Sequence, residues 1–167
     1  PMFAVARMMN NPYLQRFLDK HNFRNGATII SKKRGFTGNA MRNWTKSNGA
    51  LTILFDQHCS HGAPVTFFGH DVIAFTSPAR LHVHSGAPLL VGAFLRTGHL
   101  KYKLKVVGEP IREVEGNTSE EKVNNLTAEM IKRLEVVIRE YPEQYLWMYR
   151  RFQYIPDYAC CFLKAGL

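Results

Sequence analysis

Short runs of apolar residues alternate along this chain with segments in which apolar residues recur every three or four positions. The runs at 2–9, 28–30 and 51–55 predict buried strands, and the continuous run at 51–55 is typical of a parallel strand covered on both faces. Strands and helices in alternation indicate a layered α/β fold. The pattern therefore predicts a mainly parallel sheet flanked by helices.

Helices are predicted from the three-and-four spacing and from residues that favour helix ends. Asn11 and Pro12 suit the N-cap and first position of one helix, and Thr118 with Glu121 has the capping-box pattern at the start of another. Pro142 either ends that helix or begins a new one. The expected helices begin at Pro12, span 37–48 and 78–85, and run from Thr118 to about Pro142.

The second half of the chain also predicts a β-hairpin. Residues 89–95 and 102–107 alternate or run apolar, and the turn between them is expected at 96–99. Residues 58–76 are rich in glycine and histidine and are expected to form a loop that holds an apolar patch at 65–69.

One domain covering residues 1–167 is the default for this length, which allows a sizeable core. Neither a signal peptide nor an 18-residue apolar run is present, so this chain is not expected to span a membrane by itself. Pro1 stands directly before an apolar run, which suggests an N-terminally truncated fold. The three cysteines lack the spacing of a disulfide framework or zinc site, and no metal or cofactor is expected.

The net charge of +9 is concentrated in the first third of the chain. Residues 1–49 contain nine Lys and Arg residues against Asp19 alone, whereas the remainder is nearly balanced. Such a segment attracts polyanions: anionic lipid headgroups, phosphorylated sugars, an acidic carrier protein or nucleic acid. Charge alone does not choose among these partners.

Several polar side chains are candidates for chemistry. Asp56, with Gln57 beside it, follows the expected strand at 51–55, where parallel sheets place ligands; a turn role is the alternative. Arg7 follows the first strand, and its planar fork suits a phosphate or carboxylate. Thr76 and Ser77 open a helix whose backbone N–H groups could hold an anion, although ordinary capping explains them equally.

Two motifs are more specific than the rest. One is Asp56-Gln57, nine residues and then Phe67-Phe68-Gly69; the other is Pro-Glu-Gln-Tyr-Leu-Trp-x-x-Arg-Arg-Phe at 142–152. In order and spacing, residues 2–153 resemble the C-terminal part of the bacterial lipid A biosynthesis acyltransferases. These are the late lauroyl and myristoyl transferases of the lysophospholipid acyltransferase group.

The resemblance implies a glycerolipid acyltransferase-like fold and a function. Such enzymes transfer a fatty acyl chain from acyl carrier protein, or less often coenzyme A, to a hydroxyl of a lipid A precursor. They are expected at the cytoplasmic face of the bacterial inner membrane, without a cofactor. The family's His-x4-Asp/Glu dyad has no counterpart here, because none of the seven histidines has an acid five positions on. The chain alone is therefore expected to be inactive.

The resemblance also implies roles for individual residues. Asp56 and Arg7 are expected to be catalytic. The expected substrate-binding residues are Arg24, Gln57, Phe67, Phe68, Thr76 and Ser77, with the two phenylalanines near an acyl channel or, alternatively, in the core. The expected membrane or headgroup contacts are Lys32, Lys33, Arg34, Trp147, Arg150 and Arg151.

Two other functions stay open. The chain could be a non-catalytic module that binds a membrane or an acyl carrier protein. It could also bind nucleic acid through its basic first third, although nucleic-acid motifs are absent and no nucleic-acid partner is expected.

Overall fold

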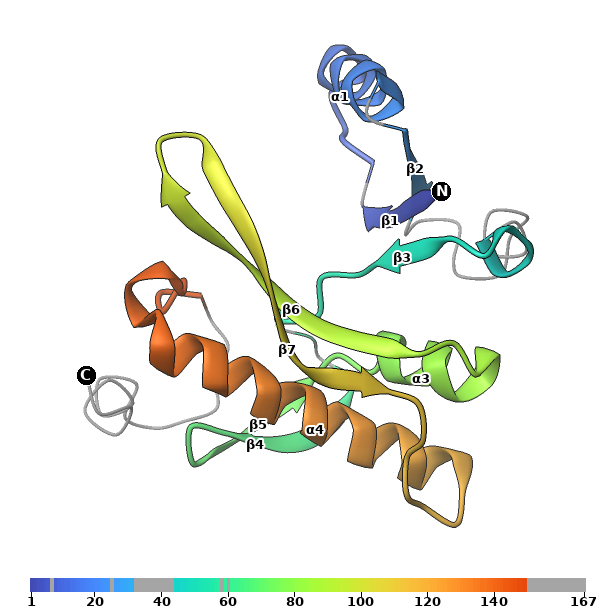
Figure 1. Ribbon diagram of the computed structural model, residues 1–167, viewed down its shortest axis with the longest axis vertical. Helices are drawn as coiled ribbons and strands as arrows, with labels where there is room; N and C mark the ends of the chain where they lie inside the picture. Colours follow the sequence, from blue (N-terminus) through green and yellow to red (C-terminus); the bar gives the residue numbers. More distant parts are fainter. Residues whose placement is uncertain (7, 25, 32–43, 58, 60, 150–167) are drawn as a thin grey trace. The chain divides into compact units, whose positions relative to one another are not determined.

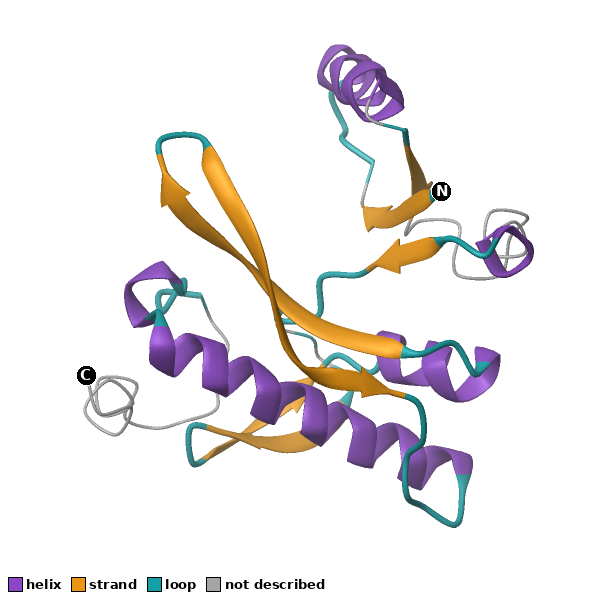
Figure 2. Ribbon diagram, viewed as in Figure 1, coloured by secondary structure: helices purple, strands orange, loops and turns teal. Residues whose placement is uncertain are grey.

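The computed structural model describes residues 1–6, 8–24, 26–31, 44–57, 59 and 61–149 (Figure 1). The chain divides into two compact units, residues 1–54 and residues 55–167. The first unit holds a parallel sheet with a helix, and the second holds two hairpins with two α-helices (Figure 2).

The first unit contains the parallel sheet that the sequence predicts. Its strands are β1 (Met2–Ala6), β2 (Ala27–Ser31) and β3 (Ala50–Thr52), in the order β2-β1-β3. Both β2 and β3 run parallel to β1. Helix α1 (Pro12–Arg24) connects β1 to β2, so these three elements form a βαβ unit.

Both ends of α1 follow the sequence. The Asn11 side-chain Oδ1 accepts hydrogen bonds from the backbone N–H groups of Tyr13 (2.9 Å) and Leu14 (3.3 Å), which confirms Asn11 as the N-cap. After Arg24, Gly26 has φ +70°, a left-handed conformation typical of a residue following a helix. Of the helix expected at 37–48, residues 44–47 are helical and 37–43 lie outside the described residues.

The strand expected at 51–55 is shorter and begins earlier. Only residues 50–52 pair with β1, and the Leu54 side chain is 62% exposed. The prediction that the run at 51–55 is a strand covered on both faces is therefore wrong, because a strand covered in this way would be buried along its whole length. Asp56 consequently lies four residues beyond the end of β3 instead of directly after it.

The loop expected at 58–76 is instead mostly a hairpin. Strands β4 (Ala63–Phe67) and β5 (His70–Ala74) pair antiparallel, with alternate residues of β4 buried. Phe68 and Gly69 form the two-residue turn, with φ angles of +50° and +77°. Positive φ at both central positions is the mark of a type I′ hairpin turn.

The remaining elements agree closely with the sequence. They are helix α3 (Ser77–Ser85), strands β6 (Leu89–Gly98) and β7 (Lys101–Ile111), helix α4 (Ser119–Glu140) and the short 3₁₀ helix η2 (Pro142–Gln144). β6 and β7 form the expected antiparallel hairpin, although both strands extend further and the turn lies at His99 and Leu100. The parallel pairing is thus confined, among the described residues, to β1–β3.

Helix α4 organises the core of the second unit. Val123, Leu126 and Met130 pack with α3, β6 and β7 in one hydrophobic cluster. Further towards the C-terminus of α4, Ile131, Leu134 and Ile138 pack with β4 and β5 in a second cluster. Figure 2 shows α4 running past both hairpins. The alternation of three and four residues along α4 therefore buries one stripe against two hairpins in succession.

Candidate functional site

The two most specific motifs of the sequence meet in an aromatic cluster. It consists of Phe67 and Phe68, at the end and turn of the β4–β5 hairpin, and Tyr145 and Trp147, which follow η2. The ring centroids of Phe68 and Trp147 are 5.5 Å apart, and those of Phe67 and Tyr145 are 6.2 Å apart. Tyr145 and Trp147 contact each other at 5.1 Å with nearly perpendicular rings. The tilted contact of Phe68 with Trp147 and the edge-to-face contact of Phe67 with Tyr145 join the hairpin turn to the segment after α4.

Burial differs among the four rings. Phe67 is completely buried, Phe68 is 6% exposed, and Tyr145 and Trp147 are half-buried at the margin of the same core. Phe67 and Phe68 therefore both lie in the hydrophobic core, which was the alternative to a position beside an acyl channel. A contact of either ring with an acyl chain, and a contact of Trp147 with a membrane, stay predictions.

Charged side chains of α4 hold the turn of the hairpin. The Phe68 backbone N–H donates a hydrogen bond of 2.7 Å to Glu135 Oε1. One helical turn later, the Arg139 guanidinium lies 4.8 Å from the Phe68 ring centroid and 3.8 Å from the Glu135 carboxylate. The Glu135 carboxylate thus accepts a hydrogen bond from the Phe68 backbone, while the Arg139 guanidinium stacks on the Phe68 ring. Neither Glu135 nor Arg139 was predicted as part of the site.

Asp56 and Gln57 follow a residue that is anchored in the core. The Phe55 side chain is half-buried and packs against both hydrophobic clusters of the second unit. Asp56 is half-buried next to it, and Gln57 is exposed. Phe55 therefore fixes the backbone from which the two candidate polar side chains project.

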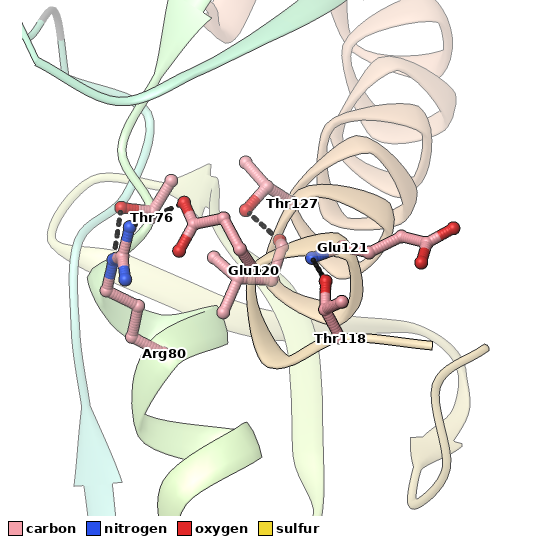
Figure 3. Close-up of polar contacts among 7 residues, drawn as sticks. Thr76, Arg80, Thr118, Glu120, Glu121 and Thr127 are labelled. Carbon is pink, nitrogen blue, oxygen red and sulfur yellow. Dashed lines mark hydrogen bonds and ion pairs between the residues drawn. The ribbon is translucent and has the colours of Figure 1, made fainter. Parts of the chain in front are cut away.

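Thr76 and Ser77 stand at the start of α3, as predicted. Thr76 is the N-cap, but its hydroxyl does not cap the helix; it accepts a 3.4 Å hydrogen bond from Arg80 Nε. Arg80 also reaches Glu120 in the first turn of α4, at 2.8 Å (Figure 3). Pro78, the second helical residue, has no N–H, which leaves fewer backbone donors for an anion.

The start of α4 is capped as the sequence predicts. Thr118 Oγ1 accepts a hydrogen bond of 3.1 Å from the Glu121 backbone N–H (Figure 3). The Glu121 carboxylate reaches back to the backbone N–H of Asn117 at 2.8 Å, one residue before the partner in a standard capping box. Two backbone donors at the helix start are thereby satisfied.

Six predicted site residues lie outside the described residues: Arg7, Lys32, Lys33, Arg34, Arg150 and Arg151. Arg24 is the last residue of α1, and its side chain is not described. Their expected roles stay predictions.

Comparison with known families matches a stretch that includes both motifs. The family of bacterial lipid A biosynthesis acyltransferases matches residues 1–154, which is nearly the whole chain. The chain belongs to this acyltransferase family. None of the curated proteins compared with the chain matches it.

Membership of the lipid A acyltransferase family places the aromatic cluster in context. The match covers both segments that form the cluster, the Phe67-Phe68-Gly69 turn and residues 142–147. In the described part of the chain, no helix combines the length and the apolar character needed to cross a membrane.

Proposed function

We propose that this chain is the part of a lipid A acyltransferase that transfers a fatty acyl group from a thioester donor to a hydroxyl of a lipid A precursor. The donor is acyl carrier protein or coenzyme A, and the reaction takes place at the cytoplasmic face of the bacterial inner membrane. The observation that carries the proposal is the family match over residues 1–154. The two family-like motifs and the basic first third of the sequence, whose charge suits a phosphorylated acceptor, support it.

The reaction needs a base and a group that stabilises negative charge. The base removes the proton of the acceptor hydroxyl, whose oxygen attacks the thioester carbonyl. The tetrahedral intermediate collapses, the carbon–sulfur bond breaks, and the departing thiolate takes up a proton. The product is an ester and a free thiol, with no change of oxidation state.

We assign roles to residues of this chain within that reaction. Asp56 orients a basic group or accepts a hydrogen bond from substrate, and Arg7 binds an anionic oxygen of donor or acceptor. Arg24, Gln57, Phe67, Phe68, Thr76 and Ser77 are the proposed substrate-binding residues. The base is proposed to be the His of a His-x4-Asp/Glu dyad elsewhere in the intact protein, since residues 1–167 contain no such pair.

A transfer assay tests the proposal. The intact protein is incubated with an acyl donor and an acylated lipid A precursor, and mass spectrometry follows the acceptor. We expect the acceptor to gain the mass of one fatty acid less one water. Stoichiometric binding of the acyl carrier protein with no gain in acceptor mass would contradict the enzyme and support the non-catalytic module.

A further inference from the structure

The outer face of the β6–β7 hairpin is apolar and exposed. This face is formed by Leu90, Phe94, Tyr102, Leu104 and Val106, whose exposed fractions lie between 45% and 64%. An antiparallel hairpin that packs one face on a core normally presents polar side chains on the other. Scattered apolar residues are ordinary on a surface, but a contiguous set on one strand pair indicates a binding surface.

The strand register places these side chains together. Phe94 pairs with Leu104, Gly92 with Val106 and Arg96 with Tyr102, so all of them point to the same face. The other face carries Val91 and Leu95, which are buried, and Val91 packs with residues of α4. The hairpin is therefore apolar on both faces, and only one of them is covered within the second unit.

The tip of the hairpin has a second unusual feature. Leu100 has φ +55° and is 80% exposed. A positive φ is unfavourable for a leucine, whereas Gly or Asn would adopt it readily. Exposure of a large apolar side chain at such a position contributes nothing to folding, which points to a role in binding.

The charge of the hairpin restricts its partner. Between Leu89 and Gly108 there are four basic residues and no acidic residue. Arg96, Lys101 and Lys103 are exposed near the tip, whereas Lys105 forms an ion pair with Glu140 of α4. This hydrogen-bonded pair raises the pKa of Lys105 and lowers that of Glu140. Arg96 therefore lies on the apolar face, whereas Lys101 and Lys103 alternate to the opposite face of the hairpin, close to its tip.

We propose that the β6–β7 hairpin docks on an anionic lipid bilayer. Phe94, Leu100 and Leu104 enter the boundary between headgroups and acyl chains, and Tyr102 lies at headgroup depth. Arg96 on the apolar face and Lys101 and Lys103 on the other side of the tip contact lipid phosphates. A second copy of the hairpin fits less well, because face-to-face packing would cover Arg96 of each copy and residues 89–108 contain no acidic residue to pair with it. This proposal rests on the proposed function, because the choice of a bacterial membrane as the partner depends on it. It adds the surface through which the chain contacts that membrane.

Vesicle binding of the 167-residue chain tests the proposal without acyl donor or lipid A precursor. The vesicles contain phosphatidylethanolamine with phosphatidylglycerol, or phosphatidylcholine alone. Leu100→Asn is the first variant, because it removes the exposed apolar side chain and suits the positive φ. Phe94→Ser/Leu104→Ser is the second. Val136→Ser is the control, since Val136 is also exposed (55%) but lies on α4.

We expect the unmodified chain to bind anionic vesicles and the double variant to bind at least about tenfold more weakly, because two large apolar side chains no longer enter the bilayer. Leu100→Asn is expected to weaken binding about threefold or more while thermal stability is kept or raised. Val136→Ser is expected to bind like the unmodified chain.

Several results would overturn the proposal. One is unchanged binding in Leu100→Asn and in the double variant, with folding confirmed by circular dichroism. Another is a concentration-dependent dimer that only these variants abolish, which would assign the face to a second copy. Loss of DNA binding in place of vesicle binding would assign it to nucleic acid. Since the assay contains no acyl donor, its failure leaves the transfer assay of the proposed function independent.

Discussion

At the scale of single residues, Phe68 is where local preference and packing conflict. A type I′ turn favours Asn or Asp at its first central position, because these residues tolerate positive φ. Phe68 adopts φ +50° instead, and its ring contacts Phe67, Trp147 and Arg139. Ring packing and the hydrogen bond to Glu135 therefore offset the backbone cost.

The sequence could not reveal this arrangement. Alternating apolar residues at 63, 65 and 67 and at 72 and 74 are a strand signal. The turn has the usual Gly at its second central position but Phe68 at the first, where Asn, Asp or Gly normally marks a hairpin. Glu135 is 67 positions away from Phe68, and a single sequence contains no sign of that contact. The sequence drew attention to both motifs, whereas their contact through the aromatic cluster was not predicted.

Glu135 provides a direct test of how the turn is held. Glu135→Ala leaves the Phe68 N–H without this acceptor, and we expect the free energy of unfolding to fall by about 1–3 kcal/mol. Glu135→Gln keeps an acceptor oxygen and should retain most of the stability. Urea denaturation of the two variants measures the difference, and equal losses would mean that the charge, not the hydrogen bond, matters.

Asp56 and Arg7 are tested by kinetics in the intact protein. We expect Asp56→Ala and Arg7→Ala each to lower kcat/KM by ~10²-fold or more, the usual cost of removing a charge-stabilising or positioning group. The folded state is checked by circular dichroism. Glu143→Ala, an exposed carboxylate in η2, is the control and should keep its activity. Near-normal kinetics in both test variants would reduce Asp56 and Arg7 to turn and surface roles.

At the scale of elements, the sequence predicts best those whose ends carry a local signal. α3 ends before Gly86 at φ +69°, α4 begins at the capping box of Thr118, and β6 and β7 alternate. β3 was predicted too long, because an apolar run does not show how many of its residues find a partner strand. Pairing is a tertiary property, and the three residues that pair with β1 determine its length.

The cap of α4 has a measurable share in stability. Thr118→Ala removes the acceptor for the Glu121 N–H, and we expect a loss of about 1 kcal/mol. Thr118→Ser keeps the hydroxyl and should lose much less. Thermal unfolding followed by circular dichroism compares the two, and similar midpoints would show that water replaces the threonine hydroxyl at no cost.

At the scale of the whole molecule, charge and apolar surface are distributed differently. Most of the net positive charge lies in residues 1–49, whereas the largest contiguous apolar strand face described above lies on β6–β7. Attraction between exposed charges weakens as salt screens it, but burial of apolar side chains does not. The two contributions to membrane binding can therefore be separated by salt.

Charge reversal in the basic segment tests the first contribution. For Lys32→Glu/Lys33→Glu/Arg34→Glu we expect weaker binding to anionic vesicles, by about 1 kcal/mol for each basic residue lost near the surface. Raising the salt concentration should remove most of the difference between this variant and the unmodified chain. Binding that is equal at low salt would exclude these three residues from the headgroup contact.

Acyl transfer needs a general base, and residues 1–167 contain no His-x4-Asp/Glu pair to provide one. We therefore expect no transfer from acyl carrier protein thioester to a lipid A precursor, even while the chain binds anionic vesicles. Vesicle binding in the same preparation is the control for folding. Turnover would instead require one of the chain's own histidines as the base, and His58, His61 and His70 are closest in sequence to the Phe67-Phe68-Gly69 motif. Alanine variants of the three would then identify it, because loss of the base lowers kcat and leaves vesicle binding intact.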